Sequence, residues 1–248
     1  LEDKFGVSAA APVATSATAS VAGLPLQTFP DSHDEYAGEQ FLDLYWFDLY
    51  EDSSAQGTLY LFGKVHLPER GGRGDPGAYA SCCVVVPNQL RTLYFLPREG
   101  VDVMDVYKEV NSLLHDMLPK GAANFRCKPV KRRYAFELGD VPRAETTYLK
   151  VQFPRKFKAP SEGISGATFS RVFGCNQSGI ERFVLSRDLM GPQWVRVLRP
   201  VNKGTMRSWC KYEIVVDSPK SISKISGSLT TLRSSTGTCS PSFVTSSS

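Results

Sequence analysis

The strongest constraint on the fold is a series of short runs of aromatic and β-branched residues separated by turn residues, a pattern typical of β-strands. Four such runs occupy 41–50, 58–67, 79–86 and 90–96. The polar stretch 53–57 divides the first two as a hairpin turn would, and Pro87-Asn88 divides the last two. The glycine-rich stretch 68–77 is expected to be a loop. The sequence therefore predicts a fold dominated by strands.

Two helices are expected among these strands. Asp102 can cap a helix that runs to about Leu118, because apolar residues recur there every three or four positions. Ser178-Gly-Ile-Glu181 forms a capping box that begins a second helix. Further strands are expected at 123–130, 133–138, 147–153, 193–198 and 209–216. We therefore predict an α+β fold, mostly β, with a ferredoxin/RRM-like β-α-β-β-α-β module over 90–199 and additional hairpins.

The chain is expected to have three parts. Residues 1–39 are poor in large apolar side chains and are interpreted as a disordered or linker arm. Residues 40–220 form the folded body, and 221–248 form a tail rich in Ser and Thr. No apolar run reaches the roughly 18 residues needed to cross a bilayer, so no membrane partner is expected. The six cysteines show no C-x-x-C spacing, which argues against zinc and favours a reducing, intracellular compartment.

Charge is distributed unevenly along the sequence. Residues 31–60 hold eight acidic residues and no Lys or Arg, whereas 126–158 hold ten Lys and Arg against three acidic residues. The basic stretch indicates either a contact surface for a polyanion or an ordinary solvated face. Tyr134 and Phe136 would share one strand face, where they either stack on bases or pack in the core. The candidate nucleic-acid-binding residues are Arg126, Lys128, Lys131, Arg132, Arg133, Tyr134, Arg155, Lys156 and Lys158.

No catalytic pattern is found. The sequence contains no G-x-S-x-G, no G-x-x-x-x-G-K-[ST] and no H-E-x-x-H motif. The strand signature by which RRM domains stack bases is also missing. We therefore predict no catalytic residues, no metal ligands and no cofactor within this sequence.

Several strings resemble one protein family in their order along the chain. They include the eight residues from Tyr45 to Asp52, Leu61-Phe-Gly-Lys-Val65, Ser81-Cys-Cys-Val-Val-Val86, the nine residues from Arg91 to Glu99, and Ser208-Trp-Cys-Lys211. They resemble the N-terminal domain of the catalytic subunit of eukaryotic DNA polymerase alpha, a family-B DNA polymerase. The likeness covers about 45–215, while the loop at 68–77 and Lys131-Arg-Arg133 are local departures from the family pattern.

The resemblance implies a part of a nuclear replication enzyme that extends RNA–DNA primers. The palm aspartates that hold Mg²⁺ for nucleotidyl transfer, the exonuclease-like domain, and the C-terminal regions that contact primase and the accessory subunit would lie outside this sequence. Any enzyme activity would belong to the longer polymerase. The expected role is a non-catalytic domain that packs against the exonuclease-like and palm domains and contacts single-stranded template and primer–template weakly. The alternative is a scaffold without nucleic-acid contact.

Overall fold

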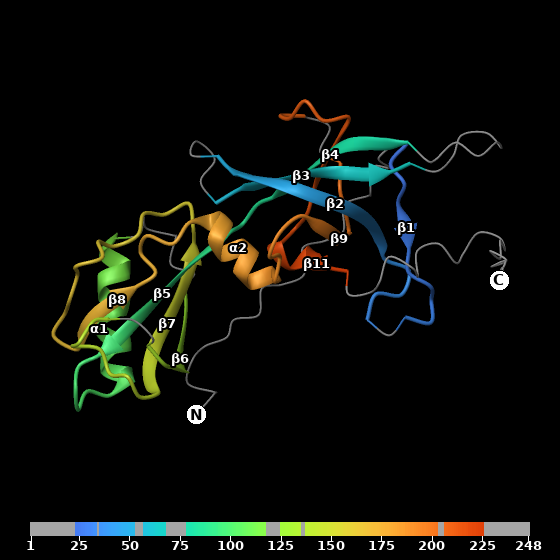
Figure 1. Ribbon diagram of the computed structural model, residues 1–248. Coiled ribbons are helices and arrows are strands. Elements are labelled where there is room, and N and C mark those ends of the chain that lie inside the picture. The colour runs from blue at the N-terminus through green and yellow to red at the C-terminus, as the bar shows by residue number, and fades with distance from the viewer. Residues whose placement is uncertain are drawn as a thin grey trace, which may run out of the picture.

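The computed structural model describes residues 23–33, 35–52, 57–67, 78–117, 125–134, 137–202 and 206–225. Within these ranges the chain forms two β-sheets, two α-helices and a short 3-10 helix at Pro219–Ser221. Figure 1 shows α2 lying between the two sheets and α1 packed on the smaller one. The predicted α+β, mostly β fold class is confirmed. No helix in the described ranges is long and apolar enough to cross a membrane.

The large sheet has seven strands in the order β10-β4-β3-β2-β9-β11, with β1 paired to β2. Its pairings are antiparallel except that of β10 with β4. One face carries leucines and valines that form a core with Phe183 and Leu189 beside α2. The strands are β1 (Gln27–Thr28), β2 (Gln40–Glu51), β3 (Leu59–His66), β4 (Tyr79–Val86), β9 (Gln193–Leu198), β10 (Tyr212–Val215) and β11 (Ile222–Lys224).

The small sheet has four antiparallel strands in the order β6-β7-β5-β8. Helix α1 (Val103–Met117) covers one face and buries Val106, Val110 and Leu114 there. Asp102 caps this helix as predicted, since its Oδ1 accepts a hydrogen bond from the N–H of Met104 at 2.7 Å. The strands are β5 (Leu90–Pro97), β6 (Arg126–Arg132), β7 (Thr146–Pro154) and β8 (Phe169–Phe173).

The small sheet has the strand order of a ferredoxin-like module, but the second helix differs from expectation. Helix α2 (Gly179–Arg187) follows β8 instead of preceding it, and the next strand, β9, joins the large sheet. The connection from β7 to β8 contains Pro160, Gly163 and Gly166, which disfavour a helix. The capping box at Ser178 therefore starts α2 only after β8, with Ser178 Oγ accepting from the N–H of Glu181 at 2.9 Å.

Other predicted elements have shifted boundaries. Of the expected strand at 133–138, residues 133, 134, 137 and 138 lie in no strand, and 135–136 lie outside the described residues. Most of the expected arm also lies outside them, but its described part contains β1 and buries Leu24 and Phe29. The expected loop 68–77 cannot be placed because it falls outside the described ranges. Of the expected tail, only Ser221, β11 and Ile225 lie within the described residues.

Candidate nucleic-acid interface

The basic strand β6 lies at an edge of the small sheet and presents different side chains to its two faces. Cys127 packs in the core beneath α1, whereas Val130 packs in a second cluster on the opposite face. Because side chains alternate along a strand, Arg126, Lys128 and Arg132 share the face of Val130. All three are exposed. The face of the small sheet turned away from α1 therefore carries three of the predicted basic residues, and we call it the open face.

A row of four side chains crosses the open face from edge to edge. Lys128 on β6 is opposite Lys150 on β7, Lys150 is opposite Tyr94 on β5, and Tyr94 is opposite Phe173 on β8. Directly opposite residues in antiparallel strands place their Cβ atoms about 4.5–5.5 Å apart. The sheet thus lines up two ammonium groups with two aromatic rings. Cations for phosphates beside rings for bases are the two components of single-strand binding surfaces.

Positive charge is concentrated at this row. The pKa of Lys150 is lowered, first by burial and then by the nearby charges of Arg182, Lys128 and Arg132. Arg182 comes from α2, so the helix between the sheets adds a cation to the same place. A lowered ammonium pKa means that protonation of Lys150 is opposed by its surroundings. An anion bound here would relieve that opposition.

The far end of the open face is filled by aromatic packing. Tyr134 is partly buried, and its ring lies 5.5 Å from the ring of Phe173. Tyr148 also contacts Phe173, at 6.1 Å, and Val141 covers them. Tyr134 therefore packs in this small cluster, while Phe136 lies outside the described residues. The accessible part of the open face is the end near Arg126 and Lys128.

The remaining predicted residues do not join this row. Lys131 alternates to the α1 side of β6, and Arg133 is exposed just beyond the strand. Lys156 and Lys158 are exposed in the connection after β7, with the ammonium of Lys156 5.2 Å from the ring centre of Phe157. These four cations surround the small sheet without converging on one site.

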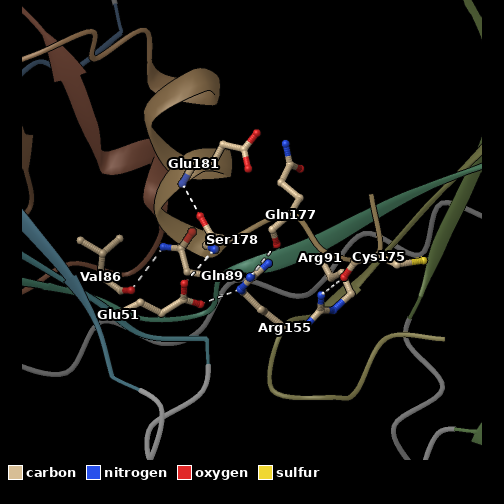
Figure 2. A network of polar contacts seen from close by, with 10 residues as sticks. Glu51, Val86, Gln89, Arg91, Arg155, Cys175, Gln177, Ser178 and Glu181 are labelled. Carbon is tan, nitrogen blue, oxygen red and sulfur yellow. Dashed lines mark hydrogen bonds and ion pairs between the residues drawn. The ribbon is translucent and has the colours of Figure 1, made fainter. Parts of the chain in front are cut away.

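Arg155 has a structural place at the junction of the two sheets (Figure 2). It is 9% exposed, and its Nε donates to Glu51 Oε1 at 2.7 Å. A second guanidinium nitrogen donates to the carbonyl oxygen of Gln177, also at 2.7 Å. A guanidinium that is buried and paired in this way is not available to a phosphate. Arg155 must therefore be removed from the predicted interface.

The same junction also fixes α2. The second oxygen of Glu51 accepts from the N–H of Gly179, the first residue of the helix, at 2.8 Å. Arg91 donates to the carbonyl oxygen of Cys175 at 3.0 Å, and burial followed by the charge of Arg155 lowers its pKa. The Glu51 carboxylate thus binds both the N-terminus of α2 and the guanidinium of Arg155, and the guanidinium of Arg91 lies within its electrostatic range. We call these contacts the Glu51 junction.

Comparisons with known proteins identify the family. The chain is 37% identical over 230 residues to the DNA polymerase alpha catalytic subunit of Xenopus laevis, an alignment that covers 87% of this chain and 15% of the relative. The corresponding proteins of Mus musculus and Saccharomyces cerevisiae are each 36% identical, over 75% and 72% of this chain and 13% and 12% of theirs. This chain belongs to the family of DNA polymerase alpha catalytic subunits. It spans about 15% of the length of the Xenopus relative.

A second comparison places part of this polymerase-family chain within a domain. Residues 170–233 match the family model described as DNA polymerase family B, exonuclease domain. The match begins in β8 and continues through α2, β9, β10 and β11. The boundary expected at 220 falls inside the matched range, and the match corrects the expectation that the exonuclease-like domain lies wholly outside this sequence.

Family-B polymerases imply Mg²⁺, an ion that proteins hold with closely placed carboxylate oxygens. The described residues contain no group of three or more His, Cys, Asp or Glu side chains that could hold a metal ion. Asp43, an acid in the acidic part of the sequence, is bound by Arg196 through two contacts of 2.8 Å. The described part of this polymerase-family chain does not fit a Mg²⁺ site.

Sequence reasoning missed four residues of the open face: Lys150, Arg182, Tyr94 and Phe173. Lys150 lies in the basic stretch and inside a predicted strand. The alternation of side chains between the two faces of that strand could have identified it as a surface residue. Arg182 carries no local signal, because its position near Lys150 depends on where α2 packs. Tyr94 and Phe173 needed the pairing of β5 with β8, a strand that was not predicted.

Proposed function

We propose that this chain is a non-catalytic domain of a DNA polymerase alpha catalytic subunit that guides single-stranded template during extension of RNA–DNA primers. The observation that carries this proposal is the convergence of Lys128, Lys150 and Arg182 at the accessible part of the open face. These cations supply phosphate contacts, which position a strand without reading base sequence. In the longer protein this region would pack against the remainder of the exonuclease-like domain and against the palm domain. Primase, the accessory subunit and the catalytic Mg²⁺ would be bound elsewhere, and the protein would act in the nucleus.

The test is binding of a fluorescent oligo(dT) to the chain, followed by anisotropy at several salt concentrations. With three or four phosphate contacts, affinity should fall about 20–50-fold between 50 and 200 mM salt, because counterions are released on binding. Affinity that does not change with salt, or no binding at low salt, would contradict the proposal.

A matched pair of variants on one strand makes the test specific for the open face. Lys128→Glu changes the row, whereas Lys131→Glu makes the same charge change on the other side of β6. Lys128→Glu should weaken oligo(dT) binding about tenfold and reduce the salt slope by about one. Lys131→Glu should change affinity by about twofold. Equal losses in both variants would mean that net charge, not the open face, drives binding.

A second function, a protein-interaction scaffold, is favoured by a different observation. Tyr45, Phe47, Tyr50 and Trp209 expose large apolar surfaces on or beside the large sheet. Under a pure scaffold role, neither of the two charge variants would change oligo(dT) affinity. Binding of oligo(dT) would then be weak and equal for all three proteins.

A further inference from the structure

Two of the cations that converge at the open face are carried by elements that meet at the Glu51 junction. Arg182 lies on α2, and Lys150 lies on β7. Burial is the first cause of the lowered pKa of Lys150, and Arg182 comes next, ahead of Lys128, which is directly opposite on β6. The guanidinium of Arg182 therefore lies close to the ammonium of Lys150. The position of α2 decides whether these two charges act on one ligand.

Helix α2 is packed on the large sheet and reaches the small sheet with one side chain. Phe183 is 1% exposed in the core of the large sheet. Arg182 precedes it, so its side chain points about 100° away around the helix. Arg182 is half-buried and acts on Lys150 of the small sheet. The cationic site is therefore composite, because one of its charges comes from a helix that is anchored to the other sheet.

One side chain fixes the first turn of α2 against the end of β7. Glu51 Oε2 accepts from the N–H of Gly179 at 2.8 Å, three residues before Arg182. Glu51 Oε1 accepts from Arg155 Nε at 2.7 Å, and Arg155 directly follows the last residue of β7. Figure 2 shows the carboxylate between the start of the helix and the guanidinium. The spacing of α2 and β7, and with it the spacing of their cations, therefore depends on Glu51.

Hydrogen bonds connect this carboxylate to Arg182 through the start of the helix. Arg155 donates to the carbonyl oxygen of Gln177, the residue before the N-cap, at 2.7 Å. The N–H of Arg182 donates to the carbonyl oxygen of Ser178 at 3.1 Å and closes the first turn. Because the backbone of a helical turn is fixed by such bonds, displacement of the start of α2 moves Arg182 with it.

The charge of Glu51 and its position have opposite consequences for an anionic strand. A carboxylate near the open face lowers the positive potential there, so its charge alone weakens binding. Its contacts hold Arg182 beside Lys150 before a ligand arrives, and such preorganisation strengthens binding. A substitution that removes the charge and leaves the shape of the side chain separates the two effects by their sign.

We propose that Glu51 is a positioning residue for the open face, which holds Arg182 and Lys150 at the spacing that binds one phosphate group of a single strand. The proposal rests on the proposed template contact and names the residue that sets its geometry. A phosphate bound by both cations bridges α2 and the small sheet. By reciprocity, the bound strand stabilises the junction as much as the junction favours the strand.

The experiment measures the affinity of the chain and its variants for oligo(dT) by anisotropy, well below the unfolding temperature. Arg182→Gln removes the cation on α2. Arg187→Gln is its matched control, because Arg187 lies on the same helix about 140° further around. Gly63→Ala destabilises the large sheet by close approach within the β2–β3 pair and controls for loss of stability.

Two substitutions of Glu51 test position against charge. Glu51→Gln keeps the shape and makes the chain one charge more positive, whereas Glu51→Asp keeps the charge and shortens the side chain by one methylene. The double variant with Glu51→Gln and Arg182→Gln completes a double-mutant cycle. Circular dichroism shows that each variant is folded at the temperature of measurement.

Arg182→Gln should weaken oligo(dT) binding about fivefold and reduce the salt slope by about one, while Arg187→Gln and Gly63→Ala change affinity by less than about twofold. Glu51→Gln should weaken binding about threefold in spite of its more positive charge, and Glu51→Asp should do the same. In the Arg182→Gln background, Glu51→Gln should have no further effect.

The proposal is overturned if Glu51→Gln binds oligo(dT) as well as the unchanged chain or better, or if its loss adds in full to that of Arg182→Gln. A loss in Gly63→Ala equal to that in Glu51→Gln would assign the effect to stability and would also overturn it. Failure of the template proposal is distinguishable, because the unchanged chain would then bind no oligo(dT) at low salt, or Lys128→Glu would bind it equally well.

Discussion

The two sheets each bury one face and use the other face differently. The small sheet places α1 on one side and lysines beside partly buried rings on the other. The large sheet packs its core near α2 and leaves aromatic side chains around a groove that one carboxylate, Asp52, and one guanidinium, Arg207, also line. Burial of one face is what makes each sheet stable, and it places no requirement on the charge of the other face. One chain can therefore present one outer face rich in cations and another rich in exposed aromatic side chains.

The Glu51 junction determines whether the two sheets unfold together as one body or separately as two units. Glu51→Gln should have the largest effect, because it weakens the pairing of Arg155 and the contact at the α2 N-terminus. Loss of one partner of a buried ion pair costs about 3 kcal/mol, so Tm should fall by about 6–10 °C. Calorimetry should also show the transition broaden as the sheets uncouple. An unchanged, single sharp transition would mean that apolar packing alone joins the sheets.

Gly63→Ala tests the large sheet alone. A Cβ at Gly63 would lie 2.5 Å from the carbonyl oxygen of Tyr45 and 2.8 Å from Leu44, next to an irregularity in the β2–β3 pairing. Overpacking of this kind costs about 2 kcal/mol. Urea unfolding measures the loss, and Gly139→Ala, where no atom lies within 4 Å, is the control. A loss as large in the control would show that backbone freedom, and not close approach, is the cause.

Glu109→Gln tests the small sheet and depends on pH. Burial raises the pKa of Glu109, but hydrogen bonds from Thr168 and Ala167 and the charge of Arg98 outweigh it, so the pKa is lowered overall. The N–H groups of both residues donate to its carboxylate at 2.7 Å. The stabilisation is complete above the ordinary glutamate pKa and is lost as pH falls through the folded-state pKa.

The variant should therefore lose about 1 kcal/mol at pH 7, and the two proteins should converge in the acidic range. Urea unfolding from neutral to acidic pH measures this convergence. A gap that stays constant with pH would assign the loss to packing.

Lys150→Met should have the smallest effect on stability, and in the opposite direction. Because surroundings lower the pKa of Lys150, its charge destabilises the folded chain at neutral pH. The variant should be about 0.5 kcal/mol more stable, and the difference should shrink as pH rises through the folded-state pKa of Lys150 and disappear above the ordinary lysine pKa. Oligo(dT) binding should weaken in the same protein. A variant that is less stable would show that the lysine stem matters more than its charge.

Local signals in the sequence predicted those elements that are determined by local interactions. The caps at Asp102 and Ser178 involve neighbours in sequence, and both helices begin where these caps indicated. The four strands of the first half were found from alternation and turn residues. Strand β8 was missed because it has five residues and its pairing with β5 is long-range.

The candidate site was predicted only in part, because charge along the sequence does not reveal burial. Lys128 and Arg155 look alike in the basic stretch, yet one is exposed on an edge strand and the other lies buried against Glu51. The partner of Arg155 is 104 residues away. Trp209 shows the reverse case. The sequence predicts this apolar residue inside a strand, but the structure places it before β10 with its indole fully exposed.

The Glu51 junction has a mechanical consequence. A strand, a helix terminus and the end of β7 meet at a single carboxylate. The chain itself also joins the two sheets, since only residues 87–89 separate β4 of the large sheet from β5 of the small sheet. The Glu51 contacts therefore act as a side-chain brace beside this short covalent connection, and they oppose rotation of one sheet against the other.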